Sequence, residues 1–266
     1  MTKPSGARRA PSAGSDGPAN KPPPPPTPAR QRWRLRVAIA APESAAPRSW
    51  PALLALAGLP IAGEGAGRGR VIPACPLPIG VAGEREVVDL YLVERLPVTT
   101  VRAAVTAVLT AGLSLADLHD VWVGAPSAPA GVVAADYRAH LAGPARWMIE
   151  CAVLALLGAT TLPRERRREK RTTAYDLRPL ILGIEVRGSD ASGVTLAMRL
   201  RHAPDAVGRP EEVVAALGEP PAPPLPVALV VHSIVREQVV MADDPEAPAA
   251  AAPIAAVPAP GVSSAE

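Results

Sequence analysis

Alternating apolar and charged positions near the start of the chain predict a β-strand with one buried face. Trp33, Leu35 and Val37 are separated by Arg34 and Arg36, which is the period of two of a half-buried strand. Helices are predicted where apolar residues recur every three or four positions and where Pro and Gly mark the ends. The same criteria predict the other elements of residues 32–124: a short helix at 50–57, an extended edge at 71–79, a strand at 86–94, a helix from 97 to 112 and a strand at 113–123.

This order of strand, helix, strand, strand, helix, strand is typical of a ferredoxin-like, or RRM-like, unit, in which two helices cover one face of an antiparallel sheet. The first and third strands are central neighbours in that topology. Arg34 and Arg36 are therefore expected beside Asp89 and Tyr91, on the face that the helices leave open. Such a surface could bind single-stranded RNA, or it could be a solvated face whose arginines pair with Asp89 or with a second domain.

The pattern begins again after residues 125–131, which have the composition of a linker. We predict a second ferredoxin-like unit at 132–241, with an inserted basic hairpin at 160–178. Its helix at 144–157 is apolar on most sides and is expected to be largely buried, with Cys151 as a small buried hydrophobe. The predicted fold class is thus α+β, with two tandem ferredoxin-like units that have antiparallel sheets.

Both ends of the chain have compositions that disfavour folding. Residues 1–31 contain a proline run and an excess of basic residues, and residues 242–266 are rich in Ala and Pro with only acidic charges. We predict that these Pro/Ala-rich tails are disordered, because they bury too little apolar surface to offset the entropy lost on ordering. No apolar stretch reaches the roughly 20 residues that a membrane span needs, and no signal peptide is evident. A cytoplasmic protein without a membrane partner is expected.

The strongest sign of a partner is the basic run from Arg164 to Arg171, where six basic and two acidic residues give a local charge of +4, against +3 for the whole chain. A mixture of Arg and Glu is common in solvated hairpins. In a functional ribbon, the arginines would contact a phosphate backbone or an acidic protein surface. The residues predicted to bind RNA or a partner are Arg34, Arg36, Asp89, Tyr91, Arg164, Arg166, Arg167, Arg168, Lys170 and Arg171.

No catalytic or metal site is predicted. His119 and Asp120 are adjacent on a predicted strand and therefore point to opposite faces, and His232 fails as the partner of the serine after it for the same reason. The four histidines show no metal-ligand spacing. Asp176 and Arg178 are expected to be structural, the first by accepting hydrogen bonds from backbone amides and the second by covering a strand edge.

Three stretches of the sequence follow one another in a specific order: Pro76-Leu-Pro-Ile-Gly80 followed by 84–92, Tyr175-Asp-Leu-Arg-Pro-Leu-Ile181, and Arg209-Pro-Glu-Glu-Val-Val-Ala-Ala-Leu-Gly218. Together they resemble the radical SAM-linked protein family, a domain of unknown function encoded beside, or fused behind, a radical SAM protein. The resemblance covers about residues 32–241. It implies a cytoplasmic bacterial protein that works with a radical SAM partner.

The first eighty residues depart from that family. Members usually carry Ser-His-Leu-Asp at the first helix and a Gly-Phe-x-Pro turn after it, whereas Ala40–Leu53 has no His or Asp and residues 63–70 replace the turn. A site formed by those polar residues would be lost in this copy. The chain also lacks the CxxxCxxC motif, so the iron–sulfur cluster and S-adenosylmethionine are expected on the partner.

Two functions are therefore considered. The first is a non-catalytic accessory or adapter that binds a radical SAM partner and that could also present RNA to it. The second is a stand-alone RNA-binding or RNA-modifying module, which would use the open sheet face and the basic ribbon at 164–171.

Overall fold

The computed structural model describes residues 28–40, 47, 49–63, 70–78, 80–168, 171–202, 206–245 and 247. Most of the two tails predicted to be disordered lies outside these residues. So do Lys170 and the side chains of Arg167, Arg168 and Arg171.

The first half of the chain contains the strands and helices that the alternation predicts. Ser49 caps the first helix by accepting a hydrogen bond from the backbone N–H of Ala52 (3.3 Å), and Pro51 lies in its first turn. The second helix buries Val101 and Val105. The elements are β1 (Gln31–Ile39), α1 (Trp50–Ala55), β2 (Val71–Pro73), β3 (Ala82–Leu92), α2 (Val98–Val108) and β4 (Leu113–Val121).

The second half begins with a short helix where a linker was predicted, and it contains the predicted basic hairpin as strands β6 and β7. The elements are α3 (Ala128–Gly131), β5 (Val132–Ala142), α4 (Arg146–Gly158), β6 (Pro163–Arg168), β7 (Arg171–Asp176), the 3₁₀ turn η1 (Arg178–Leu180), β8 (Ile181–Asp190), β9 (Gly193–Arg201), α5 (Pro210–Ala216) and β10 (Val230–Met241). Strands β6 and β7 pair only with each other, and they form a two-stranded sheet of their own.

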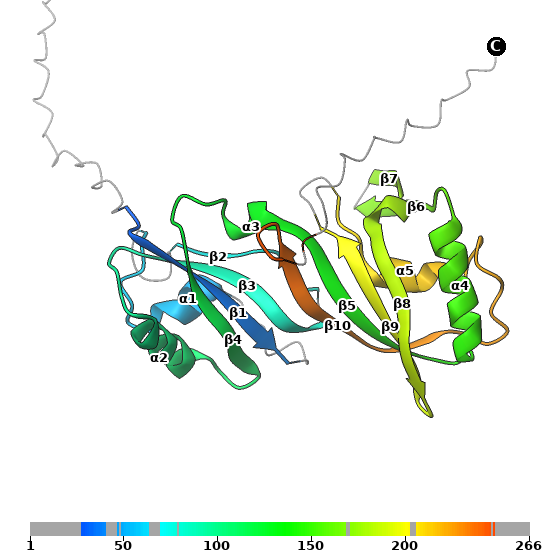
Figure 1. Cartoon of the computed structure of the whole chain (residues 1–266), viewed down its shortest axis with the longest axis horizontal. Helices are drawn as coiled ribbons and strands as arrows, with labels where there is room; N and C mark the ends of the chain where they lie inside the picture. The colour runs from blue at the N-terminus through cyan, green and yellow to red at the C-terminus, as the bar shows by residue number, and fades with distance from the viewer. Residues whose placement is uncertain are drawn as a thin grey trace, which may run out of the picture.

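The strands of both halves join in one eight-stranded sheet (Figure 1). Its order is β4-β1-β3-β10-β5-β9-β8, and the short β2 also pairs with β3. The first half therefore has the order β4-β1-β3-β2, and the second half has the order β10-β5-β9-β8. The fold is a mixed α+β fold with a large, mostly antiparallel sheet, rather than one with two separate sheets.

The two halves meet at the parallel pair β3–β10, which is short. Val235 lies opposite Ala82 and Arg236 lies opposite Gly83. Next to this pairing, the buried guanidinium of Arg236 forms an ion pair with Glu86, with Nε donating to Oε1 at 2.8 Å. This buried charge pair connects the two halves on the helix-covered side of the sheet.

Each half has its own apolar core between the sheet and its helices. In the first half, the alternating residues Trp33, Leu35 and Val37 of β1 pack with α1 and α2. In the second half, β5, β8 and β9 pack with α4 and α5. The face of β1 predicted to be apolar is therefore the face that the helices cover.

Helix α4 corrects one prediction. Its inner residues Ile149, Ala152 and Leu156 are buried, but Trp147 and Leu154 are 63% and 69% exposed, and Cys151 is exposed with them. The apolar composition of this helix therefore reflects two faces, only one of which packs on the sheet. Among the described residues, no helix is both long and apolar enough to cross a membrane.

Candidate functional site

The predicted pairing of β1 with β3 is observed, but the predicted open face is wrong. Arg34 lies directly opposite Asp89 in the register of the two strands, and Arg32 lies opposite Tyr91. All four residues are buried, and so is Arg36. The side chains of Arg34, Arg36 and Asp89 are 4%, 5% and 0% exposed. These side chains therefore cannot stack or pair with RNA on an open sheet face.

Asp89 is the centre of this buried cluster. It accepts a hydrogen bond from Arg34 Nε (2.9 Å) and another from the backbone N–H of Ala128 (2.8 Å), and Arg32 Nε lies 3.8 Å from its carboxylate. Tyr91 lies between two guanidinium groups: Arg32 Nη1 donates to its hydroxyl (3.2 Å), and Arg70 lies 3.8 Å from the centroid of its ring. The face is thus filled by its own charge pairs.

Two distant segments cover this face. Residues 125–131 lie over it, since Arg32 also donates to the carbonyl of Ala125 at 2.8 Å. The segment after β10 covers the rest, because Arg36 donates to Asp244 at 2.6 Å and Arg34 lies 3.4 Å from Asp243. Asp243 and Asp244, which were assigned to the acidic tail, are therefore part of the folded structure.

The basic hairpin forms as predicted, with Pro163 opposite Asp176 at its base and Arg168 opposite Arg171 near its tip. Arg164 forms an ion pair with Glu219 (3.0 Å). Asp176 accepts hydrogen bonds from the backbone N–H groups of Leu162 (2.7 Å) and Arg178 (3.0 Å). Arg178 in turn donates to the carbonyls of Leu157 and Ile181. These contacts fix the base of the hairpin to the end of α4 and the start of β8.

A cavity of about 670 Å³ lies next to this hairpin. It is bounded by residues 76–78 after β2, by the hairpin through Arg166, Thr173 and Tyr175, by residues 206–212 before and within α5, and by the sheet through Tyr137, His202 and Arg236. The cavity therefore brings together one segment of the first half and several segments of the second.

The three stretches that carry the family resemblance meet at this cavity. Pro76 and Pro78 come from the first stretch, Tyr175 and Leu180 from the second, and Arg209 to Glu212 from the third. Sequence reasoning identified each stretch but did not place them together. About a hundred residues separate the first stretch from the second, and tens of residues separate the second from the third. Their shared resemblance to one family was the only signal in the sequence that could have linked them.

The charges around the cavity are unequally neutralised. Arg236 is paired with Glu86, and Tyr175 donates its hydroxyl hydrogen to Glu212. Arg166 and Arg209 form no ion pair with any residue that the structure describes, and Arg166 Nε is buried without a hydrogen-bond partner there. Among the described residues, these two guanidinium groups at the cavity have no carboxylate partner.

Burial also changes the titration of groups at and beside the cavity. The pKa of His202 is lowered to about 4, first by desolvation and then by the positive charge of Arg236, so the imidazole is neutral at pH 7. Burial raises the pKa of the Cys75 thiol to about 11, so Cys75 is not a ready nucleophile. The pKa of Tyr175 is raised by desolvation and by its hydrogen bond to Glu212.

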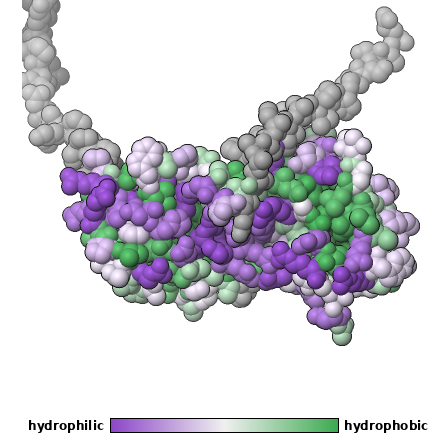
Figure 2. Space-filling model, viewed as in Figure 1, coloured by the Kyte–Doolittle hydropathy of each residue, from purple (hydrophilic) through white to green (hydrophobic). Residues whose placement is uncertain are grey.

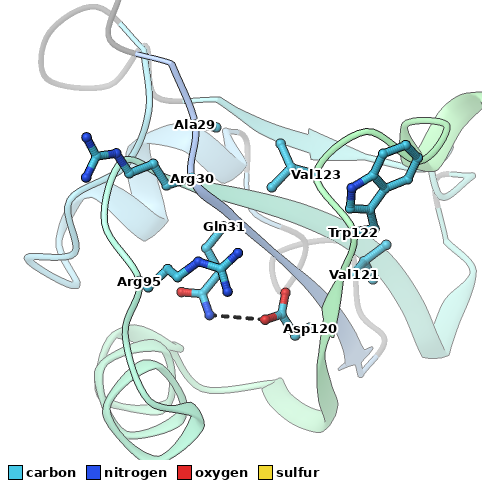
Figure 3. A pocket seen from close by; sticks show the side chains of 8 residues that line it. All are labelled: Ala29, Arg30, Gln31, Arg95, Asp120, Val121, Trp122 and Val123. Atoms are coloured by element: carbon cyan, nitrogen blue, oxygen red, sulfur yellow. Dashed lines mark hydrogen bonds between the residues drawn. The ribbon is translucent and has the colours of Figure 1, made fainter.

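A second, smaller hollow of about 340 Å³ lies where β1 begins and β4 ends (Figure 3). Gln31 donates to Asp120 at 3.2 Å within it, and Arg30, Arg95 and the exposed Trp122 also line it. Within the described part of the chain, no group of three or more His, Cys, Asp or Glu side chains could hold a metal ion. His119 and Asp120 form no catalytic pair, since His119 contacts Asp117 (3.2 Å) instead.

Comparison with known proteins places the chain in a family but assigns it no function. One similar solved chain comes from a crystal structure of a Cbf5-Nop10-Gar1 complex (TM-score 0.42, 12% identity, 78% of this chain and 48% of that chain). Another comes from the archaeal box H/ACA sRNP Nop10-Cbf5 complex (TM-score 0.39, 12% identity, 78% and 47%). This chain thus spans about half the length of those chains. No curated protein matches its sequence significantly. Residues 68–210, more than half of the sequence, match the family described as "uncharacterized protein conserved in bacteria" (DUF2344), and the chain belongs to that family.

Proposed function

We propose that this chain is a binding protein for single-stranded RNA, and that it holds the RNA along the hairpin β6–β7 and the cavity beside it without catalysing a reaction itself. One observation carries this proposal: four arginines of the sheet are paired with carboxylates, whereas Arg164 is the only arginine of the described hairpin side chains that has such a partner. The arginines Arg34, Arg36, Arg138 and Arg236 all form ion pairs with carboxylates. Residues 164–171 instead carry a net charge of +4.

The proposal follows from how proteins bind phosphate backbones. Lysine and arginine side chains displace the counterions around RNA, so the affinity falls as salt rises, with a slope set by the number of phosphates contacted. A hairpin that stands outside the main sheet can lie along such a backbone. The cavity beside the hairpin offers room for a nucleotide that turns away from the rest of the RNA.

The test measures the affinity of the full chain for a fluorescently labelled single-stranded RNA at several salt concentrations. Removing three charges in Arg166→Ala/Arg167→Ala/Arg168→Ala should weaken binding at least tenfold at physiological salt. It should also make the salt dependence shallower by about 2 in the slope of log K against log salt, since each phosphate contact contributes about 0.7 for single strands.

The matched control is Arg102→Ala/Arg146→Ala/Arg187→Ala, which removes the same charge from exposed positions on α2, α4 and β8. This control should bind RNA within about threefold of the unchanged chain. Equal losses in both triple variants would mean that only the net charge matters, and binding that ignores salt would reject the proposal.

A second candidate function is the adapter for a radical SAM protein that the resemblance implies, and the outer face of α4 favours it. Trp147, Cys151 and Leu154 are exposed there and lie on one side of the helix, which is the kind of surface that a protein partner covers. In such a complex, the iron–sulfur cluster and S-adenosylmethionine would belong to the partner. Both candidate functions imply the cytoplasm.

The test for the adapter is co-purification from native lysate. A tagged chain should capture a radical SAM protein, and Trp147→Ala/Leu154→Ala should abolish that capture while leaving RNA binding unchanged. Absence of any radical SAM protein from the captured material rejects the adapter function.

The strand orders favour a related proposal about the architecture. Apart from the inserted hairpin, both halves have the chain order strand, helix, strand, strand, helix, strand. Across the sheet, the fourth strand of each half lies beside the first, the first beside the third, and the third beside the second. We infer from this that the two halves are ferredoxin-like units joined edge to edge through β3 and β10. Solving the structure of an isolated half, stabilised by substitutions at the junction, would test the inference.

A further inference from the structure

The cavity beside the hairpin has the size and the mixed lining of a small-molecule site. Its volume of about 670 Å³ lies within the range of about 300 to 1,000 Å³ that is usual for such sites. Pro76, Leu77 and Pro78 form an apolar part of the lining, called the apolar wall below, and Leu180 and Val207 also line the cavity. This wall can pack against a flat ring without needing hydrogen bonds.

Two arginines in the lining favour a ligand that carries negative charge. Arg166 reaches the cavity from β6, and Arg209 reaches it from the residue before α5. Neither pairs with a carboxylate among the described residues, whereas the third arginine in the lining, Arg236, is neutralised by Glu86. Planar guanidinium groups bind phosphate oxygens with two parallel hydrogen bonds.

The cavity also contains hydrogen-bond acceptors. Glu211 and Glu212 line it, and the Tyr175 hydroxyl holds the Glu212 carboxylate in place. Carboxylates of nucleotide-binding proteins can accept hydrogen bonds from ribose hydroxyls, and the Glu212 carboxylate is an acceptor of this kind. His202 is neutral, so its ring offers one donor and one acceptor nitrogen. A ligand with negative charge alone would be repelled by the two glutamates, and an apolar ligand would leave the two arginines without a partner.

We propose that this cavity binds a single ribonucleotide, with its phosphate at Arg166 and Arg209, its ribose hydroxyls at Glu212 and its base against the apolar wall. The nucleotide has two sources, a free nucleoside monophosphate or one unit of an RNA strand. The second source rests on the proposed RNA-binding function, and the first does not need it.

The first arm of the experiment titrates the full chain with each of the four ribonucleoside 5′-monophosphates by calorimetry. At least one should bind saturably, and its 2′-deoxy form should bind more weakly. Arg209→Ala should weaken binding at least tenfold, and Leu77→Trp, which fills the cavity without changing its charge, should abolish it. Arg146→Ala, an exposed arginine on α4, is the control and should stay within twofold.

The second arm repeats these variants with the labelled single-stranded RNA. If the RNA is the source, monophosphates bind weakly or not at all, while Leu77→Trp and Arg209→Ala each weaken RNA binding about tenfold and Arg146→Ala does not. A cooperative thermal unfolding transition checks that each variant is folded. If Leu77→Trp does not fold, Arg209→Ala alone tests the site, because Arg209 is half-buried and lies outside the core.

The outcomes separate this inference from the proposed function. RNA binding that Leu77→Trp and Arg209→Ala leave unchanged, together with no binding of monophosphates, overturns the nucleotide site but leaves the hairpin as an RNA ribbon. Binding of monophosphates without any binding of RNA supports the site and rejects the RNA-binding function. If the unchanged chain binds neither monophosphates nor RNA, both the nucleotide site and the RNA-binding function are overturned.

Discussion

The face of the sheet opposite the helices carries charged residues in both halves, but only the first half buries them. In the first half, Arg34 and Asp89 are 4% and 0% exposed. In the second half, Arg199 pairs with Asp136 at 2.7 Å, and the two side chains are 32% and 20% exposed. In Figure 2, hydrophilic residues gather over the middle of the molecule, where Figure 1 places β10 and β5. Similar charges on similar strands therefore have very different surroundings.

The difference comes from what covers each face. Residues 125–131 and the segment after β10 lie over the first half, where Ala128, Val132 and Met241 form a small apolar cluster with Val87. In the second half, charged side chains form the surface itself, and Glu237 pairs with both Arg138 and Arg187. Burial, rather than the sequence of the strand, thus decides how much each charge pair matters for stability.

The largest expected effect comes from making the same substitution on both faces. Asp89→Asn removes the charge that neutralises Arg34 and Arg32, and it should lower the free energy of unfolding by about 3 to 5 kcal/mol, because buried guanidinium groups lose their partner. Asp136→Asn should cost less than about 1 kcal/mol. Urea denaturation of both variants measures the difference, and equal losses would break the comparison.

The second prediction concerns the pH dependence of stability, and it tests whether burial of a titrating group also matters in the second half. His202 belongs to the second half and is half-buried, and desolvation together with the charge of Arg236 lowers its pKa in the folded protein from 6.5 to about 4. Below pH 6.5 the unfolded chain binds a proton that the folded chain does not, so stability should fall between pH 6.5 and pH 4, by about 3 kcal/mol at most.

Urea denaturation at pH 7 and pH 4 tests this expectation. His202→Gln should remove that part of the pH dependence, because it removes the titrating ring. His140→Gln, on the exposed face, is the matched control and should retain it. If both variants keep the same pH dependence as the unchanged chain, other groups cause it.

The smallest expected effect concerns salt. Glu237→Gln weakens two ion pairs on the exposed face and should cost less than about 1 kcal/mol at low salt and close to nothing in 1 M NaCl, because mobile ions screen exposed charges. The loss caused by Asp89→Asn should persist in 1 M NaCl. A salt-sensitive Asp89→Asn would show that solvent reaches the buried cluster.

The sequence predicted which residues share a face but not what lies on that face. Alternation in β1 correctly separated Trp33, Leu35 and Val37 from the arginines, and the expected strand order correctly placed Arg34 beside Asp89. The predicted exposure was wrong because the covering residues come from positions about 90 and 200 residues away along the chain. A strand pattern contains no information about such distant segments.

The same limit applies to α4 and to the cavity. Periodicity showed that α4 is apolar, but it could not show that Trp147 and Cys151 point away from the core. The hairpin was predictable because its two strands are adjacent in sequence and its pairing is local. The cavity was not, since Leu77, Arg166 and Arg209 meet only after the whole sheet has assembled.

The position of β10 affects how the chain folds as it is synthesised. This strand is the last of the described strands in sequence, yet it lies between β3 and β5 in the middle of the sheet (Figure 1). Until β10 leaves the ribosome, the edges of β3 and β5 have no strand between them, and Arg34 and Arg36 lack the cover of the segment after β10. A stalled or truncated product that ends before residue 230 would therefore expose both edges to other chains, and it would be a natural substrate for chaperones and proteases.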